Sequence, residues 1–484
     1  MRTEILEKIK EKYGSRATDS SFECGLYSRD LGPVPGLLVN PLFNTTPDLV
    51  VRPSHAEEVA EILRTAYGSG IPVTPRAGAS TVYFDSVPIK GGIVMDVNLL
   101  RGIVELNEEK MTVKVRSATT WSELEGYLNR KGLACKSYPS SAPAATVGGW
   151  LCMMGYGLGS LKYGSMLSQI KSIEVVLPAG EIRTLTSETE PSLDWFAGSE
   201  GTLGVVTEVE IEVRRLTAME HFMLLLVDES ELVKVMQAFM DASVTPYNLH
   251  FADQHCLRAM DKLGFGLEGV DSGCTLGIDY EGTKEELEQA RKTVEAITSE
   301  NEKVTRLEDE VAELEWDGRF KALKLKRGGP GVLGAEVWLP VKELAGYLAE
   351  VQTMGPKYHV DLFSYGHVVT PEYITVMTTF YADETRTIPY IINLSLVKKI
   401  QDVGYRHGGC PYGVGLWNTP YLNRIYESAR LAELRKRKQQ LDPKGLMNPG
   451  KVYRPPFLMQ PFTYGLGMDV MAGVQKLVGR GGSR

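Results

Sequence analysis

Apolar and polar residues along the chain change their spacing several times, and each spacing predicts a different element. Residues 55–68 carry one apolar stripe, made of Val59, Ile62, Leu63 and Ala66, which predicts an amphipathic helix. A second helix is predicted over 120–131. Short runs bounded by turn residues predict strands over 71–74, 92–97, 103–107, 111–116, 172–177 and 182–185. This mixture predicts an α+β domain with mainly antiparallel pairing.

From about Thr217 the pattern changes to long strands that alternate with long amphipathic helices. Strands are expected over 222–227 and 273–280, and helices over 229–242 and 284–299. This alternation predicts a ferredoxin-like α+β domain. The acidic run 302–315 is typical of a solvated helix face.

The two ends of the chain differ from its middle. The start is a charged helix without the apolar run of a signal peptide, and Leu31–Gly36 indicates extended chain lying over a domain surface. The tail 455–484 follows a basic helix at 434–438 and is rich in large apolar residues. Two hypotheses stay open for it: the tail docks on a partner or a membrane surface, or it packs back on its own domain.

Composition narrows the class of protein. A chain of 484 residues favours two domains, and a net charge of −8 argues against nucleic-acid binding. The sequence contains no run of about 18 consecutive apolar residues, so no membrane span is predicted and a cytoplasmic protein is expected. The six cysteines lack C-x-x-C spacing, which argues against an iron–sulfur cluster in this chain and favours scattered, reduced thiols.

Three glycine-rich segments carry the candidate chemistry. They span 75–81, 146–149 and 198–208. Small residues let backbone amides approach a diphosphate closely, and successive N–H groups form a concavity that binds anions. Three such segments, separated by predicted strands and helices, favour a nucleotide cofactor over simple turns.

These segments resemble the FAD domain of the vanillyl-alcohol oxidase/para-cresol methylhydroxylase flavoprotein family, closest to its glycolate oxidase and D-lactate dehydrogenase branch. Residues 47–54 are similar to the family's entry strand, and Leu441–Lys451 is similar to its closing signature. The resemblance implies a two-part FAD-binding domain of the PCMH type with a ferredoxin-like substrate cap. The expected divisions are a lead-in at 1–45, the FAD-binding domain at 46–217, the cap at 218–440, a return to the FAD-binding domain at 441–454, and a tail at 455–484.

The resemblance also implies which residues hold the flavin. The first loop supplies backbone amides for the diphosphate, the second runs past the flavin ring, and the third contacts the adenosine or the ring. The expected contacts are Arg76, Ala77, Gly78, Ala79, Ser80, Thr81, Pro139, Ser140, Thr146, Gly148, Gly149, Gly155, Gly157, Tyr163, Gly201, Gly204 and Val206. Several relatives tether FAD through a histidine of the first loop. No histidine lies between His55 and His221, so non-covalent FAD is expected.

The substrate side departs from the hydroxy-acid branch, which has a G-H-x-G-D-G-N-x-H stretch and a later E-H-G-I-G stretch. Only His367 survives from the first stretch, and Pro411 and Tyr412 replace the glutamate and histidine of the second. A metal needs at least about three good protein ligands, so none is expected. His367 and His407 are candidate bases. Arg319 or Arg327 could clamp the carboxylate of an anionic substrate. The resemblance to phenol-oxidising relatives implies that Tyr412 could stabilise a phenolate. Each of these three residues could equally be an ordinary packing or surface residue.

The leading hypothesis is an FAD-dependent dehydrogenase that acts on CH–OH donors and oxidises a small 2-hydroxy acid of the glycolate or D-lactate type. The sequence has no cluster, haem motif or nicotinamide fingerprint, so the expected electron acceptor is oxygen, a quinone or another protein. Because many dehydrogenases that the chain resembles work beside an iron–sulfur subunit, an iron–sulfur or other acceptor protein is preferred. One alternative is oxidation of a phenolic or other alcohol. Another is a flavoprotein subunit that only relays electrons within a larger iron–sulfur complex.

Overall fold

The computed structural model describes residues 2–32, 42–264, 266, 273–320 and 322–478, and within them the chain forms two compact units. Unit 1 consists of Met1–Gly155, Ser165–Arg215 and Gly413–Tyr464. Unit 2 consists of Tyr156–Gly164, Leu216–Tyr412 and Gly465–Arg484. The sequence divides the chain near residues 217 and 440, whereas the compact units change at Arg215 and at Gly413. Part of the predicted lead-in, residues 33–36, lies outside the described residues.

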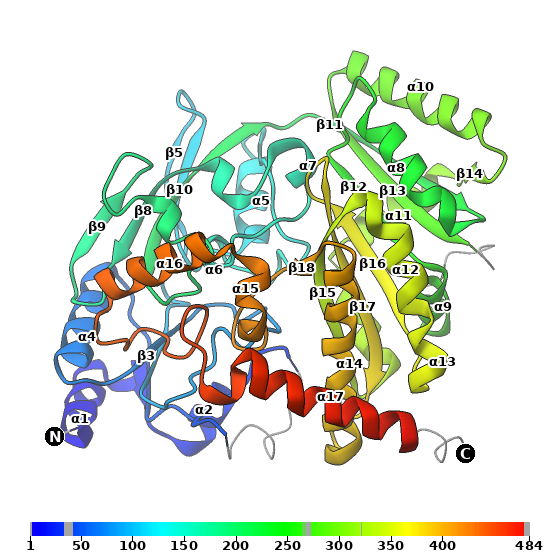
Figure 1. Ribbon diagram of the computed structural model, residues 1–484. Helices are drawn as coiled ribbons and strands as arrows, with labels where there is room; N and C mark the ends of the chain where they lie inside the picture. The colour runs from blue at the N-terminus through cyan, green and yellow to red at the C-terminus, as the bar shows by residue number, and fades with distance from the viewer. Residues whose placement is uncertain (1, 33–41, 265, 267–272, 321, 479–484) are drawn as a thin grey trace. The chain divides into compact units, whose positions relative to one another are not determined.

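The first sheet of unit 1 has four strands in the order β1-β2-β4-β3, of which β3 is labelled in Figure 1. These strands are β1 (Ala17–Thr18), β2 (Leu49–Val51), β4 (Ile93–Asp96) and β3 (Val73–Arg76). β2 and β3 both pair with β4 in parallel, so the expectation of antiparallel pairing is wrong for this sheet. The reason is α4 (Ala56–Gly68), a crossover helix that reverses the chain between β2 and β3. Its predicted stripe is buried as expected.

The second sheet of unit 1 is antiparallel, as predicted. Its order is β5-β6-β10-β8-β9, with β7 pairing on β10. The strands are β5 (Ile103–Asn107), β6 (Thr112–Arg116), β10 (Val205–Arg215), β8 (Ile170–Val176), β9 (Ile182–Leu185) and β7 (Leu133–Cys135). Further helices of this unit are α1 (Arg2–Tyr13), α2 (Ser21–Leu26), α5 (Trp121–Asn129), α6 (Val147–Cys152), α15 (Leu422–Ile425) and α16 (Ser428–Leu441).

Unit 2 is built on an eight-stranded antiparallel sheet in the order β14-β11-β13-β12-β16-β17-β15-β18. The strands are β11 (Ala218–Leu226), β12 (Asn248–Ala252), β13 (Cys274–Gly282), β14 (Val304–Arg306), β15 (Gly331–Pro340), β16 (Phe363–Val368), β17 (Tyr373–Ala382) and β18 (Cys410–Pro411). The order reads as two ferredoxin-like halves, β11 to β14 and β15 to β18, joined edge to edge where β12 pairs with β16. We call this junction the seam.

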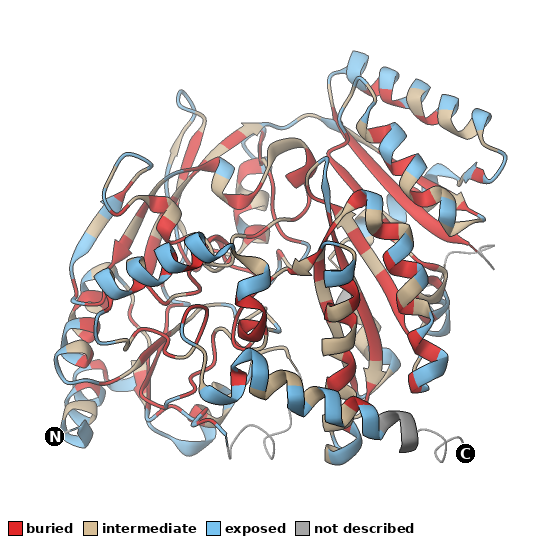
Figure 2. Cartoon of the chain, viewed as in Figure 1, coloured by how far each residue is buried: buried red, intermediate tan, exposed pale blue. Residues whose placement is uncertain are grey.

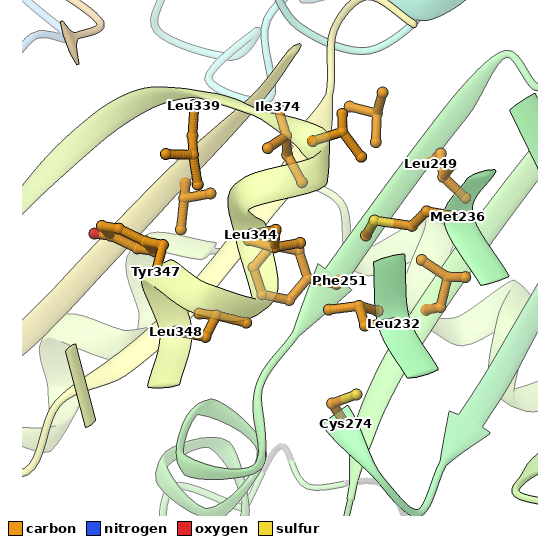
Figure 3. Close-up of a cluster of buried hydrophobic side chains, with 14 of the residues drawn as sticks. Leu232, Met236, Leu249, Phe251, Cys274, Leu339, Leu344, Tyr347, Leu348 and Ile374 are labelled. Carbon is orange, nitrogen blue, oxygen red and sulfur yellow. The ribbon is translucent and has the colours of Figure 1, made fainter. Parts of the chain in front are cut away.

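The helices of unit 2 cover the core face of this sheet. They include α8 (Leu232–Met240), α10 (Lys284–Glu300), α12 (Leu344–Gln352) and α14 (Thr387–Arg406). Strand residues alternate: Leu249 and Phe251 of β12 point into the core with Leu232 and Met236 of α8 (Figure 3). Their neighbours along β12, Asn248, His250 and Ala252, therefore lie on the other face of the sheet, which we call the open-strand face.

Most elements predicted in unit 2 are confirmed, including the buried stripe of α10 against its exposed side (Figure 2). The acidic run 302–315 agrees with the prediction in part. Its residues Glu302, Glu308, Asp309, Glu310 and Glu313 are exposed as expected. It is helical only from the start of α11 (Asp309–Gly318), because β14 precedes that helix, and its Glu315 contacts a histidine of the sheet. The remaining helices are α7 (Ser160–Tyr163), α9 (Gln254–Lys262), α13 (Met354–Tyr358) and α17 (Pro461–Val478). Among the described residues, no helix is long and apolar enough to cross a membrane.

Candidate functional site

The first glycine-rich loop of unit 1 offers a row of backbone amides. It follows β3, and among the described parts of the chain no N–H group of residues 77–81 donates a hydrogen bond. Ala79 has a φ of +47°, and the adjacent Gly78 is exposed. Successive N–H groups on alternating backbone conformations form an anion-binding concavity. The loop therefore fits the diphosphate of FAD.

Glycine lets the second loop approach the first. A Cβ atom at Gly78 would lie 2.2 Å from the backbone O of Ala144, and one at Gly148 would lie 2.6 Å from Cβ of Ser117. Gly148 also donates from its N–H to the backbone O of Ser117 at 2.7 Å. Both positions therefore require glycine for close backbone packing.

The other residues expected in the second loop shape its turn into α6. Thr146 is the N-cap of this helix, and its side chain accepts from the N–H of Gly149 at 3.3 Å. Gly155 lies against Trp150, because a Cβ there would be 2.0 Å from the indole Nε1. Pro139 is buried, whereas Ser140 is exposed.

The third glycine-rich loop is held by the two sheets of unit 1. Gly201 has a φ of +69° and lies against Pro75, which would be 3.2 Å from a Cβ. Gly204 has a φ of +151°, and a Cβ there would be 2.6 Å from the backbone O of Val176. Val206 is buried in β10 opposite Val175 of β8.

Arg76 ends β3 and is engaged within unit 1. Its Nη1 donates to the backbone O of Arg29 at 2.7 Å, and its guanidinium lies 5.3 Å from the ring centre of Tyr27. Burial lowers the pKa of Arg76 despite nearby carboxylates. These contacts position the end of β3, directly before the amides of the first loop.

A buried group of charges, not singled out from the sequence, joins the closing segment to these loops. Glu200 accepts hydrogen bonds from the N–H groups of Val414 at 3.3 Å and Gly415 at 2.8 Å. Lys451 donates from Nζ to the backbone O of Asp85 at 3.0 Å. Burial, reinforced by the charge of Asp85, raises the pKa of Glu200 to about 8, and burial lowers the pKa of Lys451 to about 8.

Two residues expected along the flavin wall belong to unit 2. Gly157 donates from its N–H to Oγ of Ser160 at 2.9 Å. Tyr163 donates its hydroxyl to Glu281 of β13, and its ring packs edge-on against Tyr247 at 6.3 Å between centres. The turn of α7 is thereby fixed on the sheet of unit 2.

His367 lies on the open-strand face at the seam, and it keeps one ring nitrogen without a partner. Nδ1 lies 3.4 Å from Oγ1 of Thr375, whereas Nε2 is buried and has no hydrogen-bond partner among the described residues. Burial, reinforced by the nearby charge of His250, lowers the pKa of His367 to about 4. The imidazole is therefore neutral at pH 7.

Sequence reasoning missed His250, which sits directly opposite His367 across the seam. Nε2 of His250 lies 3.1 Å from Oε1 of Glu315 in α11, and Nδ1 lies 3.9 Å from a carboxylate oxygen of Asp279. Burial disfavours the charge, yet the two carboxylates raise the pKa of His250 to about 9. The sequence pattern that could have revealed His250 is the alternation in β12, where the polar residues fall on one face and the large apolar residues on the other.

Arg319 is the C-cap of α11, one turn beyond Glu315. Its Nη1 donates to the backbone O of Trp316 at 2.8 Å, and its guanidinium lies 4.3 Å from the Trp316 ring centre. Nε of Arg319 is buried without a hydrogen-bond partner in the described chain. Arg319 also helps to lower the pKa of Glu315, which places it in the same group of charges as His250.

Tyr412 lies in an aromatic group of unit 2. Its hydroxyl accepts from the N–H of Tyr156 at 2.7 Å and contacts the backbone O of the same residue at 3.2 Å. Its ring stacks on Trp338 with centres 6.5 Å apart, and Trp338 also contacts Tyr373. Burial raises the pKa of Tyr412 well above its ordinary value.

The remaining two candidates are placed elsewhere in unit 2. His407 caps the C-terminus of α14 in the helix layer, with Nε2 3.0 Å from Glu350 and Nδ1 3.4 Å from Glu343. Arg327 is exposed in a 3₁₀ turn, Ala322–Gly328. The structure therefore brings His367 and Arg319 close to the charged residues His250 and Glu315, whereas His407 lies in the helix layer on the other side of the sheet.

Comparisons with known proteins agree with this geometry. Residues 47–186 match the family described as FAD binding domain, and residues 215–452 match the family described as FAD linked oxidases, C-terminal domain. The glycolate oxidase subunit GlcD of Bacillus subtilis is 26% identical over 427 residues, covering 85% of this chain and 90% of that protein. A mitochondrial D-lactate dehydrogenase (cytochrome) of Arabidopsis thaliana is 25% identical, covering 84% of this chain and 74% of that protein.

Solved structures show the same fold at lower identity. p-Cresol methylhydroxylase with substrate bound superposes with a TM-score of 0.79 at 16% identity, covering 94% of this chain and 97% of that one. Alkyldihydroxyacetonephosphate synthase gives a TM-score of 0.75 at 20% identity, covering 93% and 85%. Because an FAD binding domain is followed by the C-terminal domain of FAD linked oxidases, the chain belongs to the FAD-linked oxidases and is an FAD-dependent oxidoreductase.

Proposed function

We propose that the chain oxidises the carbinol carbon of a small 2-hydroxy acid of the glycolate or D-lactate type. The observation that carries this proposal is the neutral imidazole of His367, whose buried Nε2 has no partner in the described chain. The GlcD and D-lactate dehydrogenase relatives support the substrate class. Unit 1 would hold the cofactor, and unit 2 would supply the groups that meet the substrate.

The flavin would be held by the amides of residues 77–81 at its diphosphate, with Gly148 and Gly201 keeping the neighbouring loops close. FAD, when bound, supplies the two-electron acceptor for the hydride of the carbinol carbon. We propose that it is bound non-covalently, because the first loop carries no histidine.

His367 is proposed to take the hydroxyl proton of the substrate. Its Nδ1–H donates toward Oγ1 of Thr375, which leaves the lone pair of Nε2 to accept that proton. A base with a pKa near 4 is weak at neutral pH. A bound carboxylate would offset the positive charge of His250 and raise the pKa of His367 toward the working range.

Arg319 is the proposed partner for that carboxylate. Its guanidinium is positioned by Trp316 and retains a buried Nε without a hydrogen-bond partner in the described residues. A planar guanidinium binds carboxylates through two parallel hydrogen bonds. Arg327, the other candidate, is exposed in its 3₁₀ turn.

Anaerobic flavin reduction tests the proposal. The visible spectrum of the purified holoenzyme would be followed while glycolate, D-lactate, L-lactate and longer 2-hydroxy acids are added in turn. Bleaching by one of them is expected, and His367→Asn should slow it at least about a hundredfold if the residue acts as a general base. His359→Asn is the matched control, because His359 is exposed and has a left-handed φ of +57° that Asn tolerates. Equal rates in the two variants would exclude His367 as the base.

A phenolic alcohol is the second candidate substrate, and the aromatic group around Tyr412 favours it. Trp338 stacks on the Tyr412 ring, and the rings of Tyr156 and Tyr373 pack against Trp338. Stacking against such rings stabilises an aromatic substrate more than a small acid. Bleaching by 4-alkylphenols or vanillyl alcohol, but by no 2-hydroxy acid, would select this candidate. No bleaching by any substrate, with flavin bound, would favour a subunit that only relays electrons.

We propose that the electrons pass to a partner protein such as an iron–sulfur subunit, and that α17 offers a docking surface. Four apolar side chains spaced by four residues form one exposed stripe: Phe462, Leu466, Val470 and Val474, 79%, 59%, 60% and 39% exposed. Asp469 pairs with Lys398 and Lys399 of α14. Leu466→Ser with Val470→Ser should abolish co-purification of an acceptor; binding to anionic lipid vesicles by the unchanged chain would instead support membrane contact.

A further inference from the structure

We infer that His250, held as a cation between Glu315 and Asp279, is a positioning residue that keeps the neighbouring His367 in its neutral, proton-accepting form. The inference rests on the proposed function in one respect, namely that His367 accepts a proton from the substrate. It adds a residue to that site and explains how the site selects one protonation state. Its support is the arrangement of groups at the seam.

Strand pairing places the two imidazoles side by side. His250 of β12 is directly opposite His367 of β16, and both lie on the open-strand face. Directly opposed residues in an antiparallel pair have Cβ atoms about 5 Å apart. Two imidazolium ions at this separation repel, so protonating one ring disfavours protonating the other.

The surroundings decide which of the two rings carries the charge. Nε2 of His250 lies 3.1 Å from Oε1 of Glu315, and its Nδ1 lies 3.0 Å from Nδ2 of Asn248 and 3.9 Å from a carboxylate oxygen of Asp279. His367 faces only the uncharged hydroxyl of Thr375 among its hydrogen-bond contacts in the described chain. The charge therefore belongs on His250, in agreement with the raised pKa of His250 and the lowered pKa of His367.

Other charged groups near the pair act through the same carboxylates. His221 of β11 lies 2.7 Å from Asp279, and Asn248 donates to the other oxygen of that carboxylate at 2.8 Å. Despite burial, which raises it, the charges of His250, His221 and Arg319 lower the pKa of Glu315. The ionised form of Glu315, which faces His250, is thereby favoured.

The backbone is shaped for this position of the ring. A Cβ atom at Gly277 of β13 would lie 2.1 Å from Cε1 and 2.3 Å from Nε2 of His250. Any larger residue at Gly277 would push the ring away from its place beside Glu315. The imidazole of His250 therefore lies over a strand position that only glycine leaves open.

The test is a histidine titration by NMR on the full-length holoenzyme. The chain has only seven histidines, so Cε1–H signals are assigned by single substitutions. In the wild type we expect His250 to stay charged through pH 8 and His367 to stay neutral above pH 6. In Glu315→Gln the midpoint of His250 should fall, and the midpoint of His367 should rise by about one pH unit. Glu313→Gln, an exposed acid on the same helix, is the control and should move neither.

His250→Gln provides a second route that does not depend on how α11 tolerates substitution. It removes the charge directly, so the midpoint of His367 should rise here too. An unchanged His367 midpoint in both variants would overturn the inference, as would a wild-type His250 that titrates near 6.5. A merely structural role of His250 would not move the titration of His367.

Kinetics extend the test to the proposed reaction. The acidic limb of the pH profile of kcat/KM reports the essential base of the free enzyme. In Glu315→Gln this limb should move to higher pH by the same amount as the NMR midpoint of His367. If the midpoints move but no 2-hydroxy acid reduces the flavin, the charge pair is supported and the proposed substrate is wrong. The two failures are therefore distinguishable.

Discussion

Replacing Gly78 with alanine tests whether the contact between the first two loops supports flavin binding. A Cβ at Gly78 would lie 2.2 Å from the backbone O of Ala144, whereas an ordinary contact needs about 3.4 Å, so the loops must separate by about 1.2 Å. Overpacking of this kind costs about 1–3 kcal/mol. If that cost falls on the bound state, the Kd for FAD rises roughly 5- to 150-fold.

The assay is titration of the apoprotein with FAD, followed by quenching of flavin fluorescence. Gly68→Ala is the matched control, since Gly68 ends α4, lacks a positive φ and has open space around its Cβ position. The control should bind FAD as the wild type does. An unchanged Kd in Gly78→Ala would refute the reasoning. So would an equal loss of stability in the apoprotein, because the clash would then act on folding alone.

Three further predictions follow from single groups. Tyr412→Phe leaves the N–H of Tyr156 without its 2.7 Å acceptor, so urea unfolding should show a loss of about 1–3 kcal/mol, whereas Tyr373→Phe should show little change. Burial raises the pKa of Glu200 from 4.5 to about 8, so its contribution to stability is fully present below pH 4.5 and is lost as pH rises through 8. Glu200→Gln should therefore flatten the fall in unfolding free energy between pH 5 and 8, by at most about 1.4 kcal/mol per pH unit; an unchanged slope would contradict this. Non-covalent flavin should separate completely from the chain on acid denaturation, and yellow colour retained on the precipitated protein would contradict this.

Local patterns were enough to predict most elements of the fold. The stripe of α4 and the apolar runs of β11 and β13 are properties of short windows, and the structure has each of them. The pairing of the first sheet was not predictable in this way. β2, β3 and β4 are short and mostly buried, and their direction depends on where the intervening helix returns the chain. That return is a tertiary property.

The candidate site likewise has parts that local sequence can reveal and parts that depend on tertiary contacts. The loops proposed to hold the flavin could be picked out from the sequence, because glycine at 78, 148 and 201 allows close backbone approach or a positive φ. His250 could not be found, because its partners Glu315 and Asp279 come from distant parts of the chain. The acidic run around Glu315 was interpreted as solvated for the same reason: its neighbour across the fold was unknown.

The charge of His250 bears on which substrate is preferred, because His250 and His367 come from different halves of the sheet and meet only where β12 pairs with β16. At the seam, a neutral alcohol would leave that cation uncompensated, and His367 would remain a weak base with a pKa near 4. Under the proposed function, an anionic hydroxy acid would bring its own counter-charge, so its binding would also strengthen the proposed base, His367. Substrate charge and proton transfer are then linked through one pair of imidazoles. On this reasoning the preference for an acid lies in kcat as well as in KM, because the carboxylate acts on the base and not only on binding.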